Sequence, residues 1–238
     1  MQKILVTIMP NLNKYLAIIF LVLYKMAFAG DVIIFDKPSL VAYSDNFKIS
    51  GLYSASDGKR SCVFLFFATK SDVNIVDDEK FSSTRIYTFL PGGNGSFKFS
   101  DRNGDYDIDG ILFRRSDEWI IKTLKTQAGC GNAEGDFAFN PDDIRSTSFY
   151  IKSKVQAFGI RMVKAKTFFY DRRAGKYISR KGYLSTRDGV VVLRTHDAYS
   201  YVRYSDPGPN ANGRVTTGWI RSADLENPYP PISEKPMQ

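Results

Sequence analysis

The chain has 238 residues, of which 43% are hydrophobic, 14% aromatic and 24% charged, with a formal net charge of +8. This length and composition fit one large or two small folded domains and exclude wholesale disorder. The two cysteines exclude a disulfide-dense miniprotein and a four-cysteine zinc site, and the single histidine, His196, excludes sites that need a histidine pair.

The first 29 residues have the pattern of a secretory signal peptide. Lys3 and Lys14 give a positive leading region, Tyr15–Tyr24 is an apolar run of ten, and Ala27–Ala29 supplies the small residues that precede a cleavage site. At a rise of about 1.5 Å per residue this run covers roughly half of a bilayer core, so a retained membrane anchor is the alternative. We therefore predict a signal peptide over residues 1–29 and a periplasmic or secreted mature protein.

Cys62 and Cys130 are the only cysteines, and export would bring both into an oxidising compartment. Cys62 precedes the apolar segment Val63–Phe67, which is typical of a buried strand, and neither cysteine has a CxxC partner. We therefore predict a structural disulfide rather than a redox or nucleophilic thiol. The bond would span a sequence separation of 68 residues and contribute about 4 kcal/mol by chain entropy.

After the signal peptide, the apolar residues come in short segments rich in valine, isoleucine, tyrosine, phenylalanine and threonine. Such segments are typical of strands, and no long stretch has the period of an amphipathic helix. The sequence predicts an all-β fold, with strands over residues 63–67, 84–90, 96–100, 109–114, 119–124, 136–139, 166–170, 189–194, 198–204 and 214–220.

Charge is unevenly distributed along the mature chain. Residues 30–145 carry 14 basic and 18 acidic side chains, whereas residues 146–238 carry 16 basic and 7 acidic ones. This asymmetry indicates two domains with different surfaces. We predict an N-terminal β-domain over residues 30–150, a second domain over 151–226, and a mobile proline-rich tail over 227–238.

Five segments of the second domain form a recognisable pattern, with a Lys-Gly-Tyr turn and a terminal Gly-Trp-Ile motif as its most specific parts. The segments are Lys166–Tyr170, Lys181–Leu184, Gly189–Leu193, Tyr199–Tyr204 and Gly218–Leu225. This pattern resembles the bacterial SH3-like (SH3b-type) domain. The resemblance implies a small SH3-like barrel that follows the disulfide-linked N-terminal β-domain.

Short segments of the N-terminal half have a weaker pattern of their own, namely Gly51–Tyr53, Ser61-Cys62, Trp119–Ile121 and Gly129–Gly131. They resemble small exported β-domains of the lysozyme-inhibitor type, which place a loop in the cleft of a hydrolase. The resemblance implies an exported hydrolase as a protein partner. The candidate contact loops are residues 92–96 and 101–105.

Basic and aromatic residues are interleaved in the second domain. In an exported protein the anionic partners are wall polymers, stem-peptide carboxylates and lipid head groups, so we expect no nucleic-acid partner. Aromatic rings offer flat apolar area, and arginine offers a planar fork for a carboxylate. The alternative is that the rings fill the barrel and the charges only solvate it. The predicted ligand-binding residues are Phe169, Tyr170, Arg172, Arg173, Tyr183 and Tyr199, beside predicted loops over 171–180 and 195–198.

Asp105, Asp107 and Asp109 match the first half of a calcium loop, in which alternating oxygen ligands wrap the ion. The acidic residue that would complete the loop is missing. We therefore interpret them as water-facing residues of a strand whose Tyr106 and Leu112 face the core, and we expect no metal and no cofactor.

His196 and Asp197 lie in a predicted turn. A catalytic histidine needs an orienting group and a nucleophile within hydrogen-bond reach. Because neighbouring side chains in a turn usually point apart, we interpret His196 as an exposed turn residue.

These observations favour binding over catalysis. We predict a non-enzymatic exported binding protein, of hydrolase-inhibitor or immunity type among other options. Its β-domain contacts a protein partner, and its SH3-like domain binds an anionic cell-wall or other envelope ligand. The alternative is a cell-wall glycan hydrolase that uses an unrecognised carboxylate pair, because the 25 acidic residues leave many pairings open.

Overall fold

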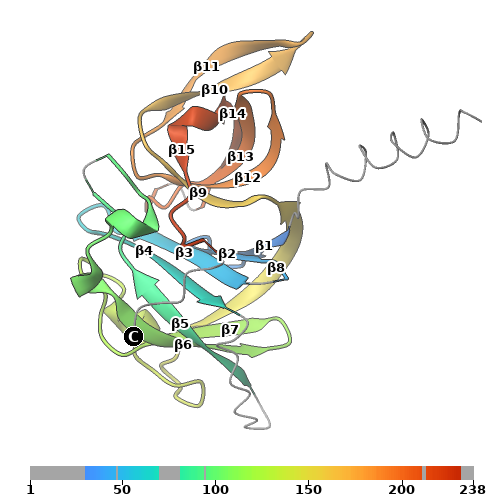
Figure 1. The fold of residues 1–238 in the computed structure, drawn as a ribbon. Coiled ribbons are helices and arrows are strands. Elements are labelled where there is room, and N and C mark those ends of the chain that lie inside the picture. Colours follow the sequence, from blue (N-terminus) through green and yellow to red (C-terminus); the bar gives the residue numbers. More distant parts are fainter. Residues whose placement is uncertain (1–29, 47, 70–80, 94, 211–212, 232–238) are drawn as a thin grey trace, which may run out of the picture.

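The computed structural model describes residues 30–46, 48–69, 81–93, 95–210 and 213–231, and the predicted signal peptide lies outside them. Within these residues the chain forms fifteen strands and, as its only helical elements, short 3₁₀ turns, which confirms the predicted all-β fold (Figure 1). Strands β1 to β8 close into a barrel, and strands β9 to β15 form a second sheet.

The N-terminal unit is an antiparallel barrel of eight strands in chain order. β1 pairs with β2 on one side and with β8 on the other, so every strand has two neighbours and no edge is left unpaired. The strands are β1 (Gly30–Phe35), β2 (Leu40–Ser44), β3 (Lys48–Ser56), β4 (Ser61–Thr69), β5 (Ser82–Phe89), β6 (Ile108–Arg115), β7 (Glu118–Thr123) and β8 (Ser148–Ala157).

Aromatic side chains fill the barrel interior. Tyr53 stacks on Phe64 with ring centroids 5.3 Å apart, and Phe137 meets both rings edge to face. On β4 the outward side chains are buried as well, so Phe64–Ala68 is an unbroken apolar run instead of an alternating one. This run indicates that another layer covers the outside of the barrel.

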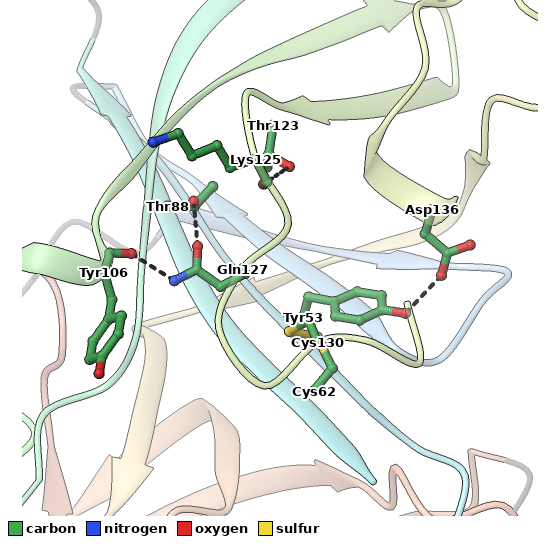
Figure 2. The surroundings of a disulfide bond; sticks show 9 residues. All are labelled: Tyr53, Cys62, Thr88, Tyr106, Thr123, Lys125, Gln127, Cys130 and Asp136. Atoms are coloured by element: carbon green, nitrogen blue, oxygen red, sulfur yellow. Dashed lines mark hydrogen bonds between the residues drawn. A yellow bond between two sulfur atoms is a disulfide. The ribbon is translucent and has the colours of Figure 1, made fainter. Parts of the chain in front are cut away.

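One end of the barrel is closed by residues 124–140, which follow β7. Cys130 in this segment is bonded to Cys62 at the start of β4, so the predicted disulfide is confirmed (Figure 2). Phe137, from the same segment, lies in the barrel core. We call residues 124–140 the plug, because they fill this end of the barrel and the disulfide fixes them to its wall.

The second unit is a sheet of seven strands in the order β11-β10-β14-β13-β12-β9-β15. Its own core lies on one face and includes Phe169, Val202 and Ile220. A small β-unit is what the sequence predicts for this part of the chain, and its membership of the SH3-like family stays a prediction. The strands are β9 (Gly159–Val163), β10 (Thr167–Arg173), β11 (Lys176–Leu184), β12 (Gly189–His196), β13 (Tyr199–Ser205), β14 (Val215–Arg221) and β15 (Leu225–Glu226).

The second sheet packs against the outside of the barrel. Leu65, Phe67 and Phe89 of the barrel share one buried apolar cluster with Met162 and Val191 of the second sheet. This cluster explains why both faces of β4 are buried. The barrel extends to the end of β8, beyond the predicted boundary at residue 150, because β8 has to run this far to pair with the whole of β1.

The chain after β15 folds back onto the barrel. Tyr229 is 4% exposed, its ring meets Phe89 edge to face at 6.2 Å, and its hydroxyl donates to the Gly51 carbonyl oxygen at 2.9 Å. Residues 228–230, predicted as part of a mobile tail over 227–238, are therefore buried between the two units. The last seven residues of that tail, 232–238, lie outside the described residues.

Candidate functional site

The face of the second sheet opposite its core carries a group of aromatic side chains. Along β13 and β14, Val202 and Ile220 point into the core, so Tyr201 and Trp219 point to the other face. Trp219 pairs in register with Tyr201 of β13 and with a tyrosine of β10. We call this group the aromatic face: Tyr170, Tyr177, Tyr199, Tyr201 and Trp219.

The rings of the aromatic face contact one another. Tyr177 stacks on Tyr199 with centroids 3.7 Å apart, and Tyr199 meets Tyr170 edge to face at 5.3 Å. Trp219 lies 5.3 Å from Tyr201 and 5.8 Å from Tyr177. All five rings are partly exposed. Their mutual contacts therefore fix their orientation while leaving flat apolar area to solvent.

Arginines border the aromatic face. The Arg194 guanidinium lies 4.6 Å from the ring centroid of Tyr201 and forms no salt bridge within the described part of the chain. Arg221 lies beside Tyr170 and Tyr199, whose hydroxyl groups raise the pKa of Arg221. The aromatic face thus presents rings and cations to the same ligand.

Of the predicted ligand-binding residues, Tyr170 and Tyr199 lie together in the aromatic face. Phe169 is 2% exposed and belongs to the core of the sheet, because neighbouring residues of a strand point to opposite faces and Tyr170 points to the aromatic face. It is therefore unavailable to a ligand. Tyr183 is 52% exposed but packs on Phe168, away from the hairpin turn.

Arg172 and Arg173 are exposed near the turn between β10 and β11. The loop predicted over residues 171–180 is wrong, because both strands continue to a turn made of Ala174 and Gly175. These two residues have φ angles of 46° and 79°, as a tight hairpin turn requires. The predicted loop is thus a β-hairpin.

His196 ends β12 and borders the aromatic face. Its ring meets Trp219 edge to face at 6.3 Å. The expectation that His196 and Asp197 point apart is wrong, because the Asp197 carboxylate lies 2.8 Å from His196 Nδ1. The loop predicted over residues 195–198 shrinks to a short turn, in which Asp197 has a φ of 51°.

Sequence reasoning missed Tyr177, Tyr201, Trp219 and Arg194 as members or neighbours of this site. For Tyr201 the available signal was the two-residue alternation of β13, which places Tyr199 and Tyr201 on one face. The stacking of Tyr177 on Tyr199 has no such signal, since it depends on how the hairpin bends.

Asp105, Asp107 and Asp109 do not converge on a calcium site. Asp107 and Asp109 form salt bridges with two different arginines, at 2.7 and 3.0 Å. Over the described ranges no group of three or more acidic, histidine or cysteine side chains is placed to hold a metal. Tyr106, predicted to face the core, is 45% exposed because residues 104–106 form a 3₁₀ turn rather than a strand.

A cleft of about 810 Å³ lies between the barrel and the second sheet, with Asp188 and Arg203 in its lining. Burial raises the pKa of Asp188, whose carboxylate accepts hydrogen bonds from the Ser185 N–H and the Tyr204 hydroxyl. Burial lowers the pKa of Arg203. Perturbed acids and cations in a cleft are candidate functional groups.

The loop over residues 92–96, predicted to contact a hydrolase, is tied to the second sheet. The Ser96 hydroxyl and the Phe97 N–H both donate to the Glu226 carboxylate. The neighbouring segment 101–105 remains largely exposed. Of the two predicted contact loops, the second is therefore the more accessible.

No helix within the described ranges has the length and apolar character needed to cross a bilayer. The disulfide is consistent with an oxidising, exported location. Comparisons with protein families, curated proteins and solved structures give no match to this chain. The interpretation of the site therefore rests on the chemistry of its own residues.

Proposed function

We propose that this chain is a non-enzymatic exported binding protein whose aromatic face binds cell-wall glycan and its peptide carboxylates. The observation that carries the proposal is the set of five partly exposed rings in mutual contact. Sugar rings present flat C–H faces that pack on aromatic rings, and carboxylates match the planar fork of arginine. The wall lies in the periplasm or outside the cell, where structural disulfides form.

The contacts among the five rings of the aromatic face should favour the affinity for the proposed wall ligand. Rings that already hold one another lose little freedom when a ligand arrives, which favours binding. The bordering arginines are exposed, and such charge contacts are each worth only about 0.2–1 kcal/mol. We therefore expect micromolar or weaker affinity that falls as salt is added.

The barrel is the part that we propose contacts a protein partner. The barrel spans residues 30–157, which carry 18 acidic and 16 basic side chains. This charge favours a basic partner, such as an exported wall hydrolase, and would raise the association rate at low salt.

Trp219→Ala is expected to weaken binding to purified sacculi about tenfold or more, which corresponds to the loss of about 1.4 kcal/mol. Trp219 occupies the centre of the aromatic face, where its ring contacts two others. Co-sedimentation of the full chain with sacculi at low salt measures the change, and near-ultraviolet circular dichroism checks the fold.

The matched control is Tyr183→Ala, which removes an exposed ring from the same sheet but outside the aromatic face. Its binding should equal that of the wild type. Equal losses in both variants, or none in Trp219→Ala, contradict the proposal. Equally tight binding of a single-stranded oligonucleotide also contradicts it, because rings and arginines bind unpaired bases as well.

The alternative function is a wall glycan hydrolase, and one observation favours it. Asp188 is a carboxyl with a raised pKa in a cleft, which is how a general acid is prepared for glycoside cleavage. In that case Asp188→Asn should abolish release of labelled fragments from peptidoglycan, while Trp219→Ala should only weaken it. Absence of any release by the wild-type protein rules the alternative out.

A further inference from the structure

The end of the barrel opposite the plug opens into a cavity of about 780 Å³. This volume lies within the range of small-molecule sites, and an eight-stranded barrel is wide enough to hold one small ligand. Strand ends from β1, β2, β5, β6 and β8 surround the opening. We call this cavity the barrel mouth; its lining includes Ile33, Arg114, Trp119, Ile151 and Lys154.

Arg114 points into the barrel mouth from β6. It lies two residues after Leu112, which is in the barrel core, so both side chains face the interior. One guanidinium nitrogen, Nη2, donates to the Thr84 hydroxyl at 3.1 Å. Its Nε is buried and has no hydrogen-bond partner among the residues that the structure describes, and burial lowers the pKa of Arg114.

No carboxylate within the described ranges forms a salt bridge with Arg114. Two acids do line the mouth, Asp31 and Asp45. Asp31 is exposed at the rim, and Asp45 accepts a hydrogen bond from the Lys48 N–H. Among the described residues the guanidinium is therefore a partly buried positive charge without a counter-charge, and such a group is unfavourable until an anion pairs with it.

The wall beside Arg114 is apolar. Trp119 is 4% exposed and Ile33 is likewise 4% exposed, and both belong to the barrel core that forms the floor of the mouth. Ile151 packs against the same core. A ligand with an anionic group and an apolar body can thus pair with the cation and cover the apolar wall at the same time.

We propose that the barrel mouth binds a small organic anion, with Arg114 pairing its carboxylate or phosphate and Trp119, Ile33 and Ile151 covering its apolar part. Arg114 Nε, which lacks a partner among the described residues, would supply a donor to this group, and a planar guanidinium can pair with a carboxylate or phosphate through two N–H groups. This site is independent of the aromatic face, which lies on the second sheet.

The test follows the fluorescence of Trp119. The chain has two tryptophans, so Trp219→Phe leaves Trp119 as the only reporter and weakens the aromatic face at the same time. Octanoate, acetate, methyl octanoate and inorganic phosphate are titrated into the full mature chain. We expect octanoate to change the emission and to bind at least tenfold more tightly than acetate, because only octanoate reaches both the cation and the apolar wall.

Arg114→Gln, made in the Trp219→Phe protein, should weaken octanoate binding at least tenfold. Octanoate should also no longer raise the thermal unfolding midpoint of this variant. Arg85→Gln is the matched control, since it makes the same charge change on neighbouring β5 at a residue already paired with Asp109. Equal binding of octanoate and acetate overturns the role of the apolar wall. Equal binding of methyl octanoate, or unchanged binding by Arg114→Gln, overturns the role of the cation.

If the protein binds phosphate tightly and does not respond to octanoate, Arg114 binds inorganic anions. That result overturns the proposal of an organic anion with an apolar body. The folded state of Arg114→Gln is checked by urea denaturation. Its midpoint should equal or exceed that of the wild type, because the variant removes a partly buried charge that lacks a partner. A lower midpoint indicates a counter-charge within the protein and overturns the proposal.

Discussion

Tyr229→Ala is expected to lower the free energy of unfolding by about 3–5 kcal/mol, the range for deleting a large buried aromatic side chain. The Tyr229 ring lies in the apolar cluster shared by the barrel and the second sheet. Its removal takes away the contact with Phe89 and the hydrogen bond to the Gly51 carbonyl oxygen. Urea denaturation of the protein, followed by tryptophan fluorescence, measures the loss.

Tyr229→Phe separates packing from the hydrogen bond. It keeps the ring and leaves a buried carbonyl without its donor, so the expected loss is about 1–3 kcal/mol. If Tyr229→Ala costs no more than Tyr229→Phe, the ring contributes nothing to the contact between the units. A total loss below about 1 kcal/mol for Tyr229→Ala is outside the range for a buried aromatic and would mean that the segment does not pack on the barrel.

The same residue has a pH signature. Burial raises the pKa of Tyr229 well above its usual value, because the ionised phenol would lose its hydration. A group whose pKa is raised on folding contributes stability that is fully present below its unfolded pKa of about 10 and is lost as the pH rises towards the folded value. Above about pH 10 the wild type should therefore lose stability more steeply than Tyr229→Phe.

The burial of Tyr229 shows where the sequence stops being informative. Four prolines in a short terminal stretch are typical of an extended, mobile tail. Proline content reports only that the chain is extended, and an extended chain still packs when an apolar groove lies beside it. That groove exists only after β9 and β12 have covered the barrel, which is a long-range contact without a local pattern.

The predicted strands were correct where a local sequence pattern specifies them and wrong where the burial of a segment depends on long-range packing. Residues 84–90, 189–194, 198–204 and 214–220 are largely strand, because alternation or β-branched runs specify them locally. Residues 96–100 and 136–139, also predicted as strands, lie in loops and 3₁₀ turns. Phe97 and Phe137 of these segments are buried by packing on neighbouring elements, and burial alone does not distinguish a strand from a packed loop.

The sequence predicts an aromatic and basic surface in the second unit, but only some of the residues that form the aromatic face. Tyr170 and Tyr199 share the aromatic face as expected from an aromatic and basic sequence region. Phe169 is buried on the other face of β10, as the alternating burial of Thr167–Tyr170 shows. Neighbouring residues of a strand face opposite sides, so one strand surface cannot include both Phe169 and Tyr170.

Reduction of the Cys62–Cys130 disulfide is expected to lower the free energy of unfolding by about 2–4 kcal/mol. The bond joins residues 68 positions apart, and releasing a loop of that length increases the freedom of the unfolded chain. It also frees the plug, whose Cys130 lies beside the barrel core (Figure 2). Urea denaturation of the oxidised and the reduced wild type measures the difference.

The reduced wild type is a cleaner test than Cys62→Ala with Cys130→Ala. Both cysteine residues are buried, at 0% and 2% exposure, so the double variant adds a cavity term to the lost cross-link. Binding to sacculi should survive reduction wherever the protein stays folded, because the aromatic face lies on the other unit.

The plug is also held by hydrogen bonds, and these determine how much stability the protein loses when the disulfide is reduced. The Gln127 side chain accepts a hydrogen bond from the Thr88 hydroxyl and donates one to the Tyr106 carbonyl oxygen, as Figure 2 shows. Tyr53 donates from inside the barrel to Asp136 at 3.0 Å. A loss below about 1 kcal/mol on reduction, under the usual range for a native disulfide, would mean that these bonds and the Phe137 ring hold the plug without the cross-link. Gln127→Ala in the reduced protein should then cause the loss that reduction alone does not.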